Sequence, residues 1–263
     1  HRWKVPSHIF KINWVFQADI LNAGSTYVSD DLQYVNPVNC FLYDPQNVDL
    51  GYEISLTDIP KNWDIATALP QKNRVLHARD MQHVMDSPWM ASPKLWHETY
   101  DVEDSEKMVN FHVWTYGDAP PQQEKFMEDH IAFSKSQISA FGTFPTSAYH
   151  FLYLLPSDTE VRHGVEHEDS TVIALGPSAK IQTHCGKTLN QVKLNTFSPQ
   201  GMPLGLPASS SLNPIDDRLR RTCTGAPSAA CRHCLQVYAS FVILVFLEME
   251  NGIFQYKIHK QSA

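Results

Sequence analysis

The sequence predicts an α+β fold in which a β-rich N-terminal domain is followed by a segment of helix plus sheet and then by an irregular tail. Three observations lead to this prediction. Short stretches of strand-like pattern, separated by turn residues, fill residues 1 to about 118. One pattern of helical period follows, and two apolar stretches come after it. After residue 177 no period persists until residue 235, and proline, serine and glycine become frequent.

The clearest strand pattern in the first part covers Met108 to Tyr116. There Val109, Phe111 and Val113 alternate with residues of the opposite face, which is the period of two expected of a strand. Weaker strand patterns cover residues 9–18, 50–56, 74–78 and 95–102.

The helical pattern runs from Glu124 to Phe141 and ends at Gly142, a residue type common at the C-terminal end of helices. Its apolar face is predicted to contain Phe126, Phe133, Ala140 and Phe141, widened by Met127, Ile131 and Ile138. His130 and Gln137 are interpreted as polar interruptions of this face. Two buried strands are predicted next, at residues 148–155 and 170–175.

The composition changes after Pro177. Residues 1–177 contain 12 basic and 24 acidic residues and all six tryptophans, whereas residues 178–263 contain 9 basic and 4 acidic residues and four of the five cysteines. A shift of this kind indicates a boundary. We therefore expect three parts: a β-rich domain at 1–120, a helix-plus-sheet segment at 121–177 and a tail at 178–263.

The overall composition excludes some classes of protein. The chain has 263 residues, 43% of them hydrophobic, and a formal net charge of -7. This suits a folded protein and argues against nucleic-acid binding, which depends on lysine and arginine to neutralise phosphates. The longest apolar run is shorter than the roughly 20 residues that cross a bilayer, so no transmembrane segment is predicted. The chain opens at His1 without an initiator methionine, and we expect it to be a fragment.

The densest group of ionisable residues lies at 162–169, between the two predicted buried strands. The simplest interpretation is a solvated surface turn, and the alternative is a functional site. Glu166 and His167 are adjacent, so in a strand their side chains would point to opposite faces and could not both reach one metal ion. Other histidines, namely His83, His112, His130 and His150, are interpreted as solvated or flanking the core.

The order of elements around this group resembles that of a known family. The segment Gly164-Val165-Glu166-His167 follows the helix and a strand and precedes another strand, and it resembles the Gly-x-Glu-His signature of the glycyl aminopeptidase family of zinc metallopeptidases. The resemblance covers about residues 10–177. Upstream segments that share it are Asn22-Ala23-Gly24-Ser25-Thr26, Tyr34-Val35-Asn36-Pro37-Val38-Asn39, Trp63-Asp64-Ile65-Ala66-Thr67 and Asp86-Ser87-Pro88.

The resemblance implies a thermolysin-like catalytic domain that begins near residue 121, often followed by a PDZ domain. In the family, zinc is bound by the two histidines of an H-E-x-x-H helix and a later glutamate. The resemblance also implies substrate-binding roles for three residues on an edge strand, Gly164, Glu166 and His167. Glu166 would hold the free α-ammonium of a peptide substrate, and residues 170–175 would offer their backbone to that peptide.

The chain departs from the family pattern after Pro177, because no histidine in the sequence begins an H-E-x-x-H motif. We therefore expect no zinc ligands, no catalytic residues and no hydrolysis from this chain alone, although the intact family binds zinc and peptides. One hypothesis is that residues 178–263 are not native to the family and come from an altered reading frame, a gene-model error or a fusion.

Two alternatives stay open. Cys231 and Cys234 form a C-x-x-C pair, but a second pair at suitable spacing is missing, which argues against a structural zinc site in the tail. The chain could also be a β-rich binding module without catalytic ancestry. Glu166 on an edge strand beside the helix would favour the peptidase, and Glu166 at an isolated loop tip would favour the binding module.

Overall fold

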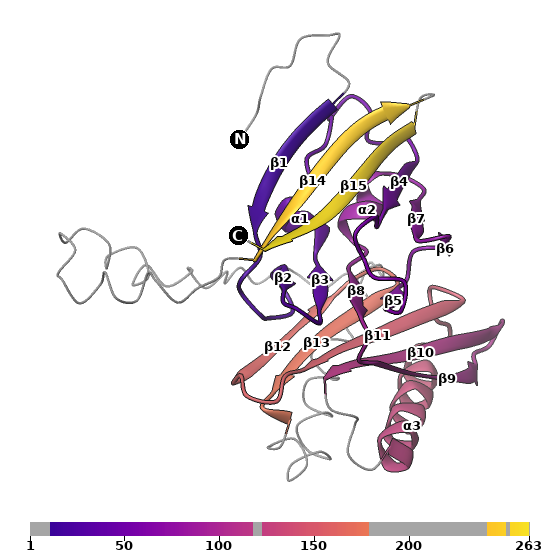
Figure 1. Cartoon of the computed structure of the whole chain (residues 1–263). Coiled ribbons are helices and arrows are strands. Elements are labelled where there is room, and N and C mark those ends of the chain that lie inside the picture. Colours follow the sequence, from indigo (N-terminus) through magenta and orange to yellow (C-terminus); the bar gives the residue numbers. More distant parts are fainter. Residues whose placement is uncertain (1–10, 118–122, 179–240, 251–252, 263) are drawn as a thin grey trace, which may run out of the picture. The chain divides into compact units, whose positions relative to one another are not determined.

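The computed structural model describes residues 11–117, 123–178, 241–250 and 253–262, which form three sheets and three helices (Figure 1). The first sheet has the order β1 (Lys11–Gln17), β14 (Phe241–Glu250), β15 (Ile253–Ser262), β4 (Tyr52–Ser55), β7 (Val75–Ala78) and β6 (Gln71–Lys72). The second has the order β2 (Tyr27–Val28), β3 (Gln33–Val35), β8 (Trp89–Ser92) and β5 (Asp64–Thr67). The third has the order β12 (Val161–Glu166), β13 (Ser170–Gly176), β11 (Ala148–Leu155), β10 (Met108–Gly117) and β9 (Leu95–Glu103).

The β-rich character predicted for the N-terminal part is confirmed. Each of the predicted strands up to residue 116 has a counterpart, in β1, β4, β7, β9 and β10. The sequence analysis missed β2, β3, β5, β6 and β8, and also the short helices α1 (Pro37–Cys40) and α2 (Met81–Met85). These elements have two to five residues, which is too short for a periodic pattern to show.

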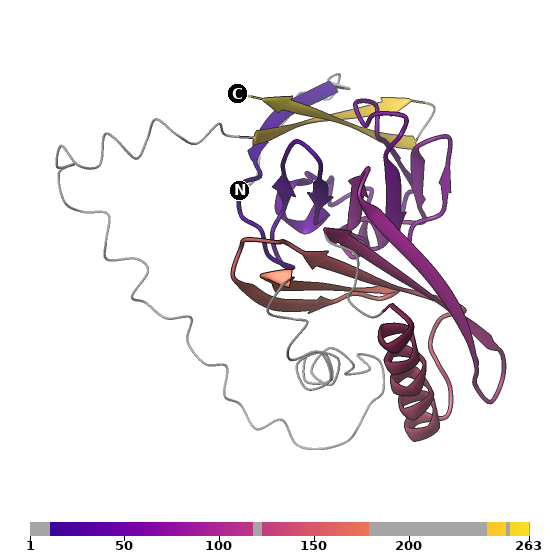
Figure 2. The same cartoon turned by 60° about the horizontal axis from the view of Figure 1, so that its bottom comes forward.

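Part of the predicted irregular tail is regular, so that prediction is wrong for residues 241–250 and 253–262. β14 pairs antiparallel with β1, and β15 pairs antiparallel with β14 and parallel with β4 (Figure 2). Residues 241–247 contain no charge and are β-prone, so their backbone is well suited to a sheet once β1 offers a partner. Residues 179–240, with Cys185, Cys223, Cys231 and Cys234, lie outside the described residues.

The third sheet carries the helix-plus-sheet segment. β10 continues through α3 (Gln123–Phe141) to β11, which lies parallel to β10, and β13 lies parallel to β11. β12 runs antiparallel to β13 and forms one edge of the sheet, while β9 forms the other. β9 and β10 come before residue 120 and β11 to β13 come after it, so the sheet joins chain segments from both sides of the predicted boundary. The three-part division itself stays a prediction.

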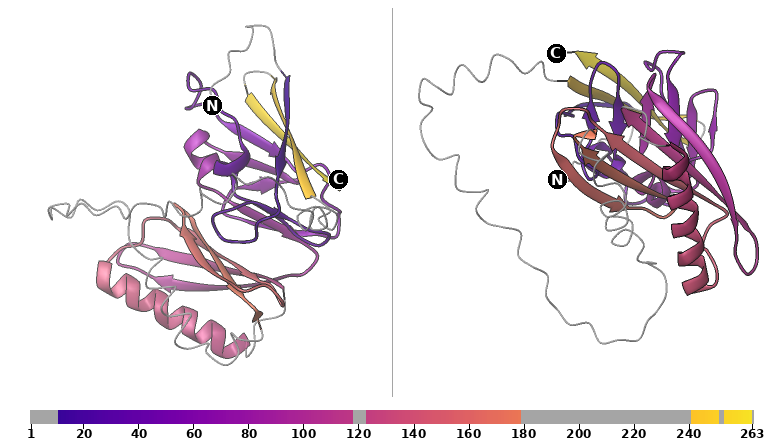
Figure 3. Two further views of the ribbon diagram at one scale, coloured as in Figure 1. Left: turned by 90° about the vertical axis from the view of Figure 1, so that its left-hand side faces the viewer. Right: turned by 90° about the horizontal axis from the view of Figure 1, so that it is seen from below.

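α3 lies along one face of this sheet (Figure 3). Its buried stripe is Phe126, His130, Ser134 and Ile138, each four residues after the one before. The predicted face is therefore only partly right, because Ala140 and Phe141 are exposed. His130, interpreted as an interruption, is fully buried and shares a hydrogen bond of 2.9 Å with the hydroxyl of Tyr153.

The second polar residue of the buried stripe, Ser134, has a hydrogen-bond partner in Tyr100. The hydroxyl of Tyr100 shares a hydrogen bond of 2.8 Å with Oγ of Ser134. A polar side chain can be buried at little cost when it keeps a hydrogen bond, and here tyrosines of β9 and β11 supply the partners. The helix therefore buries the face that carries these two polar residues.

The opposite face of the third sheet packs against the second sheet. Leu152, Leu154 and Val172 from β11 and β13 form a buried cluster with Tyr34 of β3 and Met90 of β8. The third sheet is thus covered on both faces, which explains why β11 and β13 read as continuous apolar runs.

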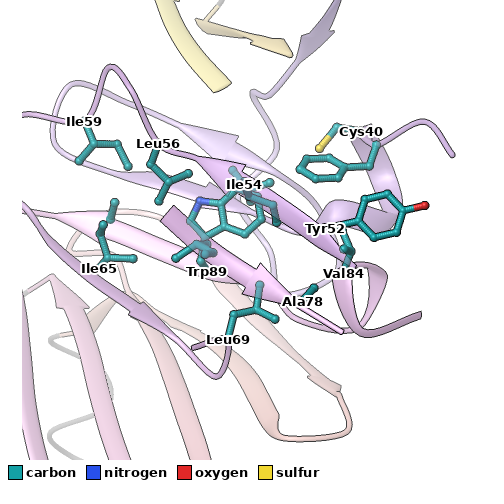
Figure 4. Close-up of a cluster of buried hydrophobic side chains, with 14 of the residues drawn as sticks. Cys40, Tyr52, Ile54, Leu56, Ile59, Ile65, Leu69, Ala78, Val84 and Trp89 are labelled. Carbon is teal, nitrogen blue, oxygen red and sulfur yellow. The ribbon is translucent and has the colours of Figure 1, made fainter. Parts of the chain in front are cut away.

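A separate core lies within the N-terminal part. Trp89 is fully buried at its centre, among side chains that include Ile54, Leu56 and Leu69 (Figure 4). Phe41 meets the Trp89 ring edge-on, with the ring centroids 5.9 Å apart. Among the described residues, no helix is long and apolar enough to span a membrane.

Candidate functional site

Glu166 is the last residue of β12, an edge strand of the third sheet. Its register partner is Thr171 of β13, whose hydroxyl shares a hydrogen bond of 2.5 Å with the hydroxyl of Tyr149. Tyr149 belongs to the cluster under α3, so Glu166 lies on the face of the sheet that α3 covers. The position is an edge strand and not an isolated loop tip.

The Glu166 carboxylate is partly buried and makes no hydrogen bond or ion pair with any described residue. Partial burial raises the pKa of Glu166 above its ordinary value, and a charge on the neighbouring His167 opposes that shift. A carboxylate that has lost water without gaining a donor is disposed to accept hydrogen bonds from a cation.

Gly164 lies two residues before Glu166 on β12, with Ile173 as its register partner, and shares the face of Glu166 because side chains alternate along a strand. The resemblance implied that residues 170–175 would offer their backbone to a peptide. The structure contradicts this, because β13 is paired on both sides, with β12 and with β11. Within the described residues, the open backbone edge beside Glu166 belongs to β12.

His167 is directed toward the N-terminal part of the chain. Its Nδ1 lies 2.9 Å from Oδ1 of Asp86, the residue that ends α2. Asp86 Oδ2 accepts a second hydrogen bond, of 3.0 Å, from the backbone N–H of Glu168. The His167 side chain is 5% exposed. Glu166 and His167 therefore have different surroundings, as expected for adjacent residues at the end of a strand.

The next two residues also contact the segment 79–86. Nη2 of Arg79 lies 2.5 Å from Oε2 of Glu168 in an ion pair that is about half exposed. Nε2 of His83 lies 3.8 Å from Oδ2 of Asp169. Burial raises the pKa of Asp169 and lowers the pKa of His83.

Sequence reasoning did not assign Asp86, Arg79 or His83 to the site. Asp86-Ser87-Pro88 was noted as a shared segment of the N-terminal domain, which is the only signal that pointed to it. The three residues lie more than 80 positions from their partners, so no local pattern could have connected them.

A second group of titratable residues lies on the opposite face of the sheet from α3. Nε2 of His97 and Nδ1 of His112 are 3.0 Å apart, and the rings of His112 and His150 stack with centroids 4.3 Å apart. His112 and His150 had been interpreted as solvated or flanking the core, and both are partly buried. Burial lowers the pKa of all three, and that of His150 falls to about 3.

The described residues do not fit a zinc centre. No group of three or more histidine, cysteine, aspartate or glutamate side chains converges among them in a way that could hold a metal ion. The three histidines of β9, β10 and β11 are neighbours in a row and do not point to a common centre.

Comparison with known proteins relates this fold to peptidases. Residues 1–93 match the family model of the Peptidase M61 N-terminal domain. The fold resembles that of an aminopeptidase N family protein from Idiomarina loihiensis, with a TM-score of 0.52 and 21% identity. That superposition covers 60% of this chain and 27% of the other, so the chain spans about a quarter of its length.

An M1 zinc metallopeptidase from Deinococcus radiodurans matches more weakly, with a TM-score of 0.39 and 14% identity over 60% of this chain and 39% of the other. No curated protein matches the chain. The M61 match thus covers about the first third of the chain, and the likeness to the aminopeptidase N family protein is one of fold.

Proposed function

We propose that the chain is the N-terminal portion of a zinc aminopeptidase similar to the glycyl aminopeptidases, and that Glu166 binds the α-ammonium of a peptide substrate. The observation that carries this proposal is the partly buried Glu166 carboxylate at the end of an edge strand, where the part of the chain that the structure describes supplies it with no donor. The M61 match over residues 1–93 and the fold of an aminopeptidase N family protein support it.

The chemistry of the site favours a free N-terminus. An ammonium group carries three donors and a positive charge, and it would provide a partner that none of the described residues offers to the Glu166 carboxylate. The backbone edge of β12 could pair with an extended peptide, and Gly164 presents no side chain on the face of Glu166. His167 lines the same turn and would hold the strand end in place. The catalytic domain, thermolysin-like in this proposal, would begin near residue 121.

The chain as written would bind peptides without hydrolysing them. Zinc in such an enzyme would polarise the peptide carbonyl and activate water, and its ligands would come from an H-E-x-x-H helix that this sequence does not contain. We expect the purified chain to hold no stoichiometric zinc and to release no amino acid from Ala-Ala-Ala. Stoichiometric zinc together with chelator-sensitive release would contradict this part of the proposal.

The binding role is tested with two peptides, Ala-Ala-Ala and its N-acetylated form, by NMR titration of the full chain. We expect Glu166→Gln to weaken binding of the free peptide about tenfold or more, which is the lower end for a hydrogen bond to a charged group. Binding of the acetylated peptide should hardly change. Glu98→Gln on β9, the opposite edge strand, is the control because it makes the same change at an exposed glutamate of the same sheet.

Equal dissociation constants of the wild-type chain for the two peptides would refute the amine-binding role. If both peptides then bound tightly, the β-rich binding module would be the better description of the protein.

The pH dependence provides a further prediction. Ammonium binding needs the ionised carboxylate, and burial raises the pKa of Glu166. Acidification should therefore weaken Ala-Ala-Ala binding with a midpoint above the ordinary glutamate pKa of about 4.3. A binding curve whose midpoint lies at or below that value would contradict the environment described for Glu166.

A further inference from the structure

We propose that the segment 79–86 of the N-terminal part positions Glu166, with Asp86 as the principal positioning residue. The inference rests on the proposed function for its substrate side, since it concerns how the amine-binding carboxylate is held. It assigns the N-terminal part a direct role in the binding site.

The contacts form a consecutive series. The three residues directly after Glu166 are His167, Glu168 and Asp169, and each meets one residue of the segment: Asp86, Arg79 and His83 respectively. These contacts hold the turn between β12 and β13, where the backbone N–H of His167 also donates a hydrogen bond of 2.8 Å to the carbonyl of Ser170. The chain is therefore fixed immediately after Glu166, at a strand end that would otherwise be free to fray.

The three contacts differ in expected strength. The Arg79 to Glu168 ion pair is about half exposed, and such pairs contribute little because water screens them. The distance of 3.8 Å between His83 and Asp169 exceeds that of a hydrogen bond. Asp86 makes two hydrogen bonds of 2.9 and 3.0 Å, one to a side chain that is 5% exposed and one to the backbone. Asp86 is thus the dominant contact.

The chemistry of the Asp86 contact also determines which ring nitrogen of His167 donates to Asp86. An ionised carboxylate can only accept hydrogen bonds, so Nδ1 of His167 carries the proton. Nε2 of His167 is buried and has no hydrogen-bond partner among the described residues. Asp86 therefore fixes the orientation of the His167 ring through its Nδ1–H, the ring N–H that points to the Asp86 carboxylate.

The test uses Asp86→Asn, which preserves size but leaves one acceptor for two donors. In the full chain we expect about tenfold faster hydrogen exchange at the Glu168 amide and a change in the shift of Nδ1 of His167. We expect about tenfold weaker binding of Ala-Ala-Ala, because a displaced carboxylate no longer meets the ammonium. Arg79→Gln should have a smaller effect on all three readouts.

Asp101→Asn is the matched control. Asp101 lies on β9 at the far edge of the same sheet and accepts one hydrogen bond of 2.7 Å, from Nδ2 of Asn110, which asparagine can still accept. We expect this variant to match the wild-type chain in all readouts. A native amide spectrum away from the turn shows that Asp86→Asn is folded.

Three outcomes are distinguishable. Unchanged exchange at Glu168, or faster exchange with unchanged Ala-Ala-Ala binding, overturns the positioning role. If the wild-type chain binds free and acetylated peptides equally, the proposed function fails. The positioning role is then judged from the carboxylate ¹³C shift of Glu166 in the variants. A shift that moves in Asp86→Asn but not in Asp101→Asn supports the positioning role, and a shift that does not move overturns it.

Discussion

Replacing Gly117 by alanine should destabilise the protein severely, by about 3 to 5 kcal/mol. Gly117 ends β10 with a φ of 110°, a conformation that residues with a side chain rarely adopt. A Cβ at this position would also lie 2.1 Å from the backbone carbonyl oxygen of Leu155, its register partner on β11. The backbone on both sides would have to move, and the parallel pairing of β10 with β11 would be lost at that end.

Gly142→Ala provides the matched control. Gly142 also has a positive φ, of 87°, but no atom lies within 4 Å of the position that a Cβ would take. Only the conformational cost is expected there, about 1 to 2 kcal/mol. Urea unfolding followed by tryptophan fluorescence measures both variants. Equal losses in the two variants would show that the close approach to Leu155 does not determine the cost at Gly117.

Acidification from pH 7 to pH 5 should destabilise the protein, with about 2 kcal/mol coming from His150 alone. The pKa of His150 falls to about 3 in the folded chain, first because of burial and then because of His112 and His97 nearby. The ordinary histidine value is about 6.5, so between these values the unfolded chain binds a proton that the folded chain does not. Stability therefore decreases as the pH falls below about 6.5.

Neighbouring groups set the size of this effect. The stacked ring of His112 and the ring of His97 beyond it would repel a proton on His150, whereas Asp101 favours charge on His112 and Asp64 favours charge on His97. Those two carboxylates reduce the stability that is lost on acidification through His97 and His112. Of the three histidines, His150 should therefore contribute the largest share of the lost stability.

The measurement is the free energy of unfolding from urea titrations at several pH values. His150→Gln should decrease the average slope of stability against pH between 5 and 6.5 by about 0.8 proton, or roughly 1.1 kcal/mol per pH unit. His163→Gln, at an exposed histidine on β12, is the comparison variant. If His150→Gln leaves the slope unchanged, His150 is not held neutral by its surroundings.

The sequence by itself determined the elements with long, regular patterns. The alternation around Phe111 predicted β10, and the apolar runs predicted β11 and β13, because the burial of a strand is recorded in its own residues. The helix was predicted within one residue of its observed start for the same reason. The absence of an H-E-x-x-H motif is also a property of the sequence alone.

The tertiary structure decided what depends on partners far along the chain. α3 buries His130 and Ser134 because Tyr153 and Tyr100 hydrogen-bond to them, so polarity by itself predicted the buried face only in part. β14 joined a sheet because β1 offers a backbone partner more than 200 residues earlier. The contact of Asp86 with His167 likewise joins residues 81 positions apart. Hydrogen bonds of this kind satisfy polar groups across space, and a local pattern contains no record of which distant group will supply the partner.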